Sequence, residues 1–86
     1  MDLEDTIAGM ISDDYKERFI AEYIQTAIRA RKLDELLFAA HENKLHFELN
    51  CPITLLASQL AAMREYLHFL EMRSKYEEID LKEVEI

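Results

Sequence analysis

The chain has 86 residues, the length of one small domain, and its 18 acidic against 10 basic residues give a net charge of -8. This excess of acid disfavours generic binding to DNA, RNA or an anionic membrane, because such binding relies on lysine and arginine meeting phosphates. One cysteine cannot form an internal disulfide, the acidic N-terminus does not resemble a signal peptide, and no apolar run is long enough to cross a bilayer. The composition predicts a soluble, intracellular protein with a single domain, residues 1–86.

An acidic arm, residues 1–11, comes first. It has no basic residue, and Gly9 interrupts any long helix, so both a short docked turn and a frayed arm fit the pattern. Ser12 can accept N–H groups from a first helical turn, and Asp13 and Asp14 suit the positive end of a helix dipole. A helix is therefore predicted over residues 12–40.

This helix carries two sets of apolar residues. The first set steps by three and four residues and forms one seam: Phe19, Tyr23, Thr26, Ala30, Leu33, Leu37 and Ala40. The second set lies beside the seam on the same cylinder: Ile20, Ile24, Ala27 and Ile28. The apolar face is therefore wider than a two-stranded seam needs.

Residues 41–51 lose the helical period. Leu45, Phe47 and Leu49 alternate with polar residues, which predicts a short extended connection whose apolar side covers one end of a hairpin. Pro52 suits the first position of a second helix, predicted over residues 52–78, because its missing N–H would be unpaired there anyway. The acidic tail, residues 79–86, fits an edge strand, a continued helix or a mobile end.

The second helix has the same two-sided character. Its seam consists of Ile53, Leu56, Leu60, Met63, Leu67 and Leu70. A second ridge recurs every seven residues and has Tyr66 beside it: Leu55, Ala62, Phe69 and Tyr76. The fold class is therefore all-α, a long antiparallel two-helix hairpin.

A hairpin with only one seam leaves both second ridges in water, and such a patch usually marks an interface. We expect self-association, most simply a dimer that forms a helical bundle. The expected interface residues are Leu55, Tyr66, Phe69, Tyr76, Ile20, Ile24 and Ile28. The alternative is that the arm folds back over the ridges, but it offers few apolar residues for this.

Catalytic signatures are weak. With a single glycine the chain has no glycine-rich phosphate loop, and neither Ser58 nor Cys51 has a recognisable base. Glu65 and His68 have the spacing of a di-iron half-site but lie away from the seam. His41 and His46 precede Cys51 without the close ligand pairs typical of zinc motifs. We expect no enzyme activity, no metal and no cofactor.

Basic residues suggest a binding site. If the hairpin turns near His46, Arg29 and Arg64 lie at one level, with Lys32 and Gln59 nearby, which makes a possible anion cradle. Tyr23 and Tyr66 are candidate stacking faces for a base. The alternative is that Arg29 and Arg64 are surface residues paired with acids such as Asp34 or Glu65, or with a dimer mate.

Residues 12–74 also resemble a family of small phage and prophage proteins related to a crAss-like phage open reading frame. The most specific part of the resemblance is the stretch Asn50-Cys51-Pro52-Ile53 followed by Leu55-Leu56. Other matching positions are Asp14-Tyr15-Lys16-Glu17-Arg18, Glu22-Tyr23, Arg29, Lys32-Leu33, Gln59, Met63, Tyr66-Leu67, Leu70-Glu71 and Arg73. The resemblance implies phage origin and expression in the cytoplasm of an infected bacterium.

A fainter similarity links the second helix, which ends near Arg73, to phage sponges that trap cyclic nucleotide or cyclic ADP-ribose signals of bacterial immune systems. This similarity implies sequestration of a nucleotide signal at a protomer interface. The hypothesised phosphate contacts are Arg29, Lys32, Arg64 and Arg73. Two alternatives remain open: an acidic inhibitor that binds a host or CRISPR-type defence protein as a nucleic-acid mimic, and a structural or accessory phage protein.

Overall fold

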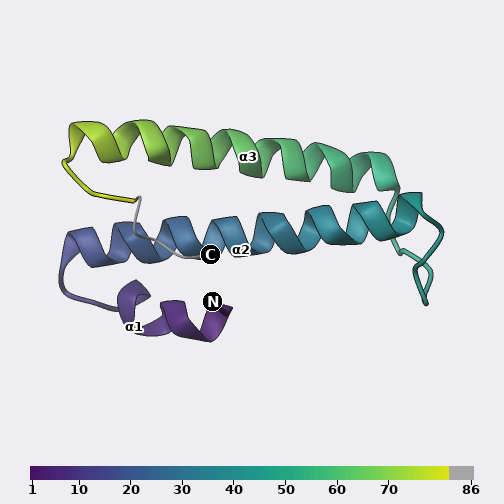
Figure 1. Cartoon of the computed structure of the whole chain (residues 1–86), viewed down its shortest axis with the longest axis horizontal. Coiled ribbons are helices and arrows are strands. Elements are labelled where there is room, and N and C mark those ends of the chain that lie inside the picture. Colours follow the sequence, from purple (N-terminus) through teal and green to yellow (C-terminus); the bar gives the residue numbers. More distant parts are fainter. Residues whose placement is uncertain (82–86) are drawn as a thin grey trace.

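The computed structural model describes residues 1–81 and measures 42 × 24 × 20 Å. A 3-10 helix, η1 (Leu3–Thr6), leads into α1 (Ile7–Met10), followed by α2 (Tyr15–His41) and α3 (Ile53–Tyr76), with no strand among these residues. The helices α2 and α3 run antiparallel side by side, and α1 lies on the opposite side of α2 (Figure 1). The prediction of an all-α two-helix hairpin is confirmed.

The first long helix begins three residues later than predicted. Asp14 is its N-cap, and the Asp14 carboxylate accepts the N–H of Lys16 at 2.9 Å. Ser12 acts before the helix instead: its Oγ accepts the N–H of Asp14 at 3.0 Å and donates to the Glu17 carboxylate at 2.6 Å. Likewise, Pro52 is the N-cap of α3 and not its first helical residue.

Both long helices end in the same way. After α2, Asn43 adopts a left-handed conformation (φ 57°) and the N–H of Lys44 reaches the carbonyl of Ala39 at 2.8 Å. After α3, Glu78 adopts the same conformation (φ 57°) and the N–H of Ile79 reaches the carbonyl of Ser74 at 2.9 Å. This is the Schellman pattern, which reverses the chain and satisfies carbonyls that the helix leaves unpaired.

The core lies between α2 and α3 and is tightest where α2 begins and α3 ends. Phe19, Leu70 and Ile79 form a buried cluster there, with Tyr23 and Leu81 packed against it. The reversal after α3 explains why the tail takes part, since it brings Ile79 back onto the hairpin. The rest of the predicted tail, residues 82–86, lies outside the described residues.

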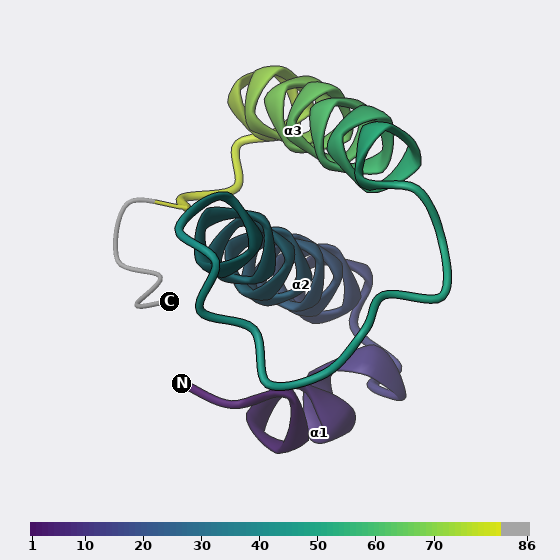
Figure 2. The ribbon, with the colours of Figure 1, turned by 90° about the vertical axis from the view of Figure 1, so that its right-hand side faces the viewer.

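The arm docks by close approach of its backbone, and most of its apolar side chains stay exposed. Thr6 is buried, and its hydroxyl donates to the carbonyl of Leu3 at 2.6 Å. A Cβ added at Gly9 would lie 2.8 Å from the Cβ of Ala21, so only glycine lets α1 lie this close to α2 (Figure 2). The side chains of Ile7, Met10 and Ile11 remain exposed.

Docking of the arm reduces the apolar surface of α2 that a second copy of the chain could contact. Ala21, Ile24 and Ile28 recur on the face of α2 that the arm covers, and all three are buried, Ile28 completely. Ile20 is half-buried. The arm therefore covers much of the second ridge of α2, which we expected to be open because the arm has few apolar residues.

The connection between the long helices contains turns, bends and residues without regular secondary structure, and no strand. Leu45 and Leu49 are half-buried, as expected of the side facing the hairpin, whereas Phe47 is exposed. Within residues 1–81, no helix combines the length and apolarity needed to cross a membrane.

Candidate functional site

A polar hub joins the start of α2 to the end of α3. The Arg73 guanidinium donates to the Tyr15 hydroxyl at 2.6 Å and to the Glu77 carboxylate at 3.1 Å, and it stacks over the Phe19 ring at 5.0 Å. Tyr15 in turn donates to Glu77 at 2.5 Å. Arg73, one of the predicted phosphate contacts, is thus engaged within the chain.

These contacts also set the acid–base properties of the hub. The hydrogen bond to Glu77 raises the pKa of Tyr15, because the carboxylate favours the protonated phenol. The hydrogen bonds from Tyr15 and Arg73 lower the pKa of Glu77 by stabilising its charged form. The hub therefore has an ionised carboxylate, a neutral phenol and a charged guanidinium at neutral pH.

Two further contacts cross between α2 and α3. The Tyr23 hydroxyl donates to Glu71 at 2.7 Å, and Arg64 forms a salt bridge with Asp34 at 3.3 Å. Burial and the hydrogen bond to Glu71 raise the pKa of Tyr23 to about 12. Tyr23 and Asp34 are three helical turns apart, and Arg64 and Glu71 are two turns apart, so the four lie along one side of the hairpin. We call this side the Arg64 flank.

The opposite side is defined by two rows. Tyr15, Glu22 and Arg29 recur every seven residues on α2, and Gln59, Tyr66 and Arg73 do so on α3. The contact between Tyr15 and Arg73 shows that these two rows border each other. We call this side, made by the six residues, the Arg29 flank.

Arg29 and Tyr66 lie at the same level of the Arg29 flank. On α2, Arg29 lies between Tyr23 and Asp34. Tyr23 contacts Glu71 and Asp34 contacts Arg64, and Tyr66 lies between these two partners on α3. The structure therefore separates the predicted cradle. Arg29, Gln59, Tyr66 and Arg73 share one flank, whereas Arg64 and Tyr23 lie on the other, and the alternative pairing of Arg64 with Asp34 is the one observed.

Two of the predicted phosphate contacts are unengaged. Arg29 and Lys32 are exposed, and neither has a charged or hydrogen-bonding partner among residues 1–81. They are one helical turn apart, so their side chains reach neighbouring space. Tyr66, which is 43% exposed, offers an open aromatic face on the same flank as Arg29.

The hub is the feature that sequence reasoning missed. Its available signal is the spacing of Arg73 and Glu77, four residues apart on one helix, which is the spacing of a helical ion pair. The role of Tyr15 has no such local signal, because its partners are more than fifty residues away along the chain.

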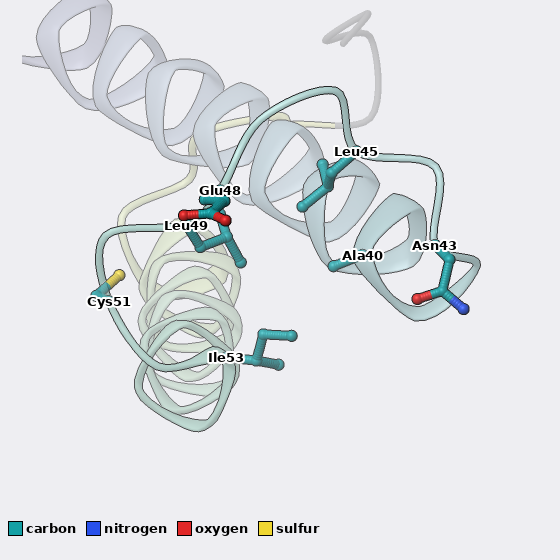
Figure 3. Close-up of a pocket in the computed structure, with 7 residues that line it drawn as sticks. All are labelled: Ala40, Asn43, Leu45, Glu48, Leu49, Cys51 and Ile53. Atoms are coloured by element: carbon teal, nitrogen blue, oxygen red, sulfur yellow. The ribbon is translucent and has the colours of Figure 1, made fainter.

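A hollow of about 400 Å³ lies at the other end of the hairpin, where Ile53 and Ala40 come from the two long helices and Leu45 and Leu49 from the connection (Figure 3). Asn43, Glu48 and Cys51 complete its lining, which contains no basic side chain. A carboxylate and apolar groups disfavour a phosphate, so the hollow does not suit the predicted ligand. Within residues 1–81, no three metal-ligating side chains gather closely enough to hold an ion.

Comparison with known proteins identifies a family for this chain. No curated protein and no solved structure matches the chain. The model of the Sequestin family matches residues 13–76, which is more than half of the chain and includes both long helices. The arm, residues 1–11, and Ser12 lie outside this match. The chain belongs to the Sequestin family.

Proposed function

We propose that this chain binds and sequesters a small anionic signal of the nucleotide type, such as a cyclic nucleotide or an ADP-ribose derivative. In this role it is a phage-encoded counter-defence protein in the cytoplasm of an infected bacterium. The observation that carries the proposal is Arg29, which has no partner among residues 1–81, at the level of an exposed Tyr66, in a family whose name denotes sequestration. Sequestration needs a ligand to be held and no bond to be broken.

Each residue has a separate role in this proposal. The planar Arg29 guanidinium binds a phosphate through two parallel hydrogen bonds, and Lys32 adds a mobile positive charge beside it. Tyr66 stacks on a base, and the Gln59 amide pairs with a polar edge of the ligand. Arg73 can join only by giving up Glu77, which makes it a weaker candidate than Arg29.

The test compares two arginines that differ in their partners. Isothermal titration with cyclic di-AMP and with cyclic ADP-ribose measures affinity for the parent, for Arg29→Ala and for Arg64→Ala. Loss of a charge-assisted contact of about 1.5–3 kcal/mol predicts at least a roughly tenfold weaker affinity for Arg29→Ala. Arg64→Ala is the matched control, because Arg64 is paired with Asp34 on the other flank. Equal effects of both variants contradict the assignment.

A second measurement separates sequestration from catalysis. The parent is incubated with the bound nucleotide and then denatured, and the released molecule is weighed by mass spectrometry. Recovery of the intact nucleotide supports a sponge. Recovery of a cleaved product means that the chain is an enzyme.

One observation favours the alternative, an acidic inhibitor of a defence protein. Six exposed acidic side chains lie within the first 17 residues, with Lys16 as the single base there: Asp2, Glu4, Asp5, Asp13, Asp14 and Glu17. A basic groove on a partner protein would attract this segment. Replacing Asp2, Glu4 and Asp5 by their amides should abolish protection of phage in the mimic case and leave it unchanged in the sponge case.

A further inference from the structure

The outward face of the arm carries apolar side chains that the fold does not use. The arm packs against α2 and against no other helix within residues 1–81. It docks through Gly9 and the buried Thr6, whereas Ile7 is 57% exposed and Ile11 is 78% exposed. Met10 is exposed as well. Packing of this chain therefore does not explain why the arm has three large apolar side chains on its outside.

These side chains line a hollow of about 350 Å³ where the arm meets α2. Its wall is mostly apolar and comes from the arm, and α2 contributes one residue. The lining consists of Leu3, Glu4, Thr6, Ile7, Met10, Ile11 and Gln25. A hollow of this volume lies within the range of pockets that take ligands or large side chains. It can therefore receive apolar side chains from outside the chain.

This surface is separate from the second ridge of α3. Leu55, Phe69 and Tyr76 on that ridge are also exposed, and they remain the predicted surface for a second copy. The arm lies on the side of α2 that faces away from α3 (Figure 2). The arm therefore needs an occupant of its own, and its charge indicates which kind.

The charge of the arm is uniformly negative. Glu4 lines the hollow, and the exposed Asp2 and Asp5 lie on either side of it in the sequence. Residues 1–15 contain no basic side chain. Glu4 has no charged or hydrogen-bonding partner among residues 1–81, so its carboxylate is available to a cation from another molecule.

An apolar hollow with carboxylates beside it favours one class of occupant. The carboxylates repel the phosphates of nucleic acids and of anionic lipids. A second copy that met this surface with its own arm would bring like charges together, which disfavours the contact. An amphipathic helix with lysine or arginine beside its apolar stripe complements both properties of the surface.

We propose that the outward face of the arm binds a basic amphipathic helix of a partner protein. Apolar side chains one turn apart on that helix enter the hollow beside Ile7 and Ile11. Its lysine or arginine side chains pair with Glu4 and with the neighbouring Asp5. The proposal goes beyond the proposed function and does not depend on which molecule the hairpin sequesters.

The test uses synthetic peptides and the full chain. The probe is an amphipathic peptide of leucine and lysine, about 14 residues or four helical turns long, with leucines in steps of three and four. One control is a scrambled peptide of the same composition, and the other is an amphipathic peptide of leucine and glutamate. Fluorescence anisotropy should show that the leucine–lysine helix binds about tenfold or more tighter than either control. Equal binding of the scrambled peptide, or no binding of the probe, overturns the proposal.

The apolar part of the surface is tested with paired substitutions. Ile7→Ser combined with Ile11→Ser should weaken binding of the probe about tenfold or more, because the two side chains no longer offer apolar surface to it. Phe38→Ser combined with Phe47→Ser is the matched control, since these side chains are equally exposed but lie outside the arm. This control should bind the probe like the parent. Circular dichroism shows that each variant is folded, and equal losses in the two variants overturn the proposal.

The acidic part is tested in the same way. Glu4→Gln combined with Asp5→Asn should weaken binding about threefold or more and reduce its dependence on salt. Glu42→Gln combined with Glu48→Gln removes the same charge from exposed positions in the connection and should change binding little. Equal losses in both variants mean that only the net charge of the chain matters, which overturns the assignment to the arm.

The remaining outcomes identify other occupants. If the probe responds to the acidic pair and not to Ile7→Ser with Ile11→Ser, the arm recognises charge alone, as a nucleic-acid mimic does, and the proposal is wrong. If sedimentation shows self-association of the parent that this apolar variant loses, a second copy occupies the surface, and the proposal is also wrong. The proposed function fails separately: a parent that binds the probe but neither cyclic di-AMP nor cyclic ADP-ribose overturns that function and supports docking at the arm.

Discussion

The two ends of the hairpin differ in how the chain closes them. The closed end, residues 15–23 with 70–81, has the buried cluster of Phe19, Leu70 and Ile79 and the hub of Tyr15, Arg73 and Glu77. At the open end, residues 37–56, Phe38, Phe47, Ile53 and Leu55 are exposed, and Ile53 also lines the hollow. The tail returns to the hairpin and buries side chains at the closed end, whereas the connection joins the two helices at the open end and leaves large apolar side chains exposed there.

The largest effect should come from deleting apolar volume at each end. Leu70→Ala removes a completely buried side chain from the closed end and should lower the free energy of unfolding by about 2–5 kcal/mol. Ile53→Ala at the open end removes a side chain that is 49% exposed and should cost less than about 1.5 kcal/mol. Urea unfolding followed by circular dichroism measures both. Equal losses would mean that the ends are equally packed.

A smaller effect concerns the hub and depends on pH. Glu77 has a lowered pKa, so its contribution to stability is present above the usual value of 4.5 and is lost as the pH falls through the folded-state value below it. Glu77→Gln should therefore lower the melting temperature at pH 7, and parent and variant should converge in acid. Glu35→Gln is the matched control, since Glu35 also forms an ion pair at this spacing, with Arg31 at 3.8 Å. A constant difference across the pH range would show that the Glu77 charge is not what matters.

The smallest effect compares the two helix ends directly. Glu78 and Asn43 share the left-handed conformation, which strains most residues but suits asparagine better than glutamate. Glu78→Gly should raise the free energy of unfolding by about 0.5–1 kcal/mol, whereas Asn43→Gly should change it by less than that. Thermal melts of the two variants measure the difference. A larger gain at Asn43 would contradict this account of the reversal after α3.

The hairpin itself could be predicted because its signal is local and repetitive. The seams of three- and four-residue steps place both long helices correctly, to within a few residues at their ends. The start of the first long helix differs from the prediction because the N-cap is the residue whose side-chain oxygen accepts an N–H of the first turn. The pattern favoured Ser12 for this role, whereas Asp14 caps the helix. Docking of the arm could not be predicted from apolar content, because it depends on the space at Gly9 and Ala21.

The candidate site was harder to predict because it depends on helix rotation and level. Composition and spacing placed Arg29 and Arg64 together in one anion cradle, but a hairpin has two flanks, and only long-range contacts show which residue lies on which flank. The pairs Tyr23–Glu71 and Asp34–Arg64 supply that information. They leave Arg29 as the open cation at the level of Tyr66.

The contact between Gly9 and Ala21 has a consequence for how sequences of this kind can change. With 2.8 Å between a virtual Cβ and a methyl group, positions 9 and 21 together hold a fixed total of side-chain volume. A larger side chain at one position is tolerated only if the residue at the other position is glycine or alanine, or if the arm no longer packs on α2. The two positions should therefore covary among relatives that retain the arm and drift independently among relatives that lack it.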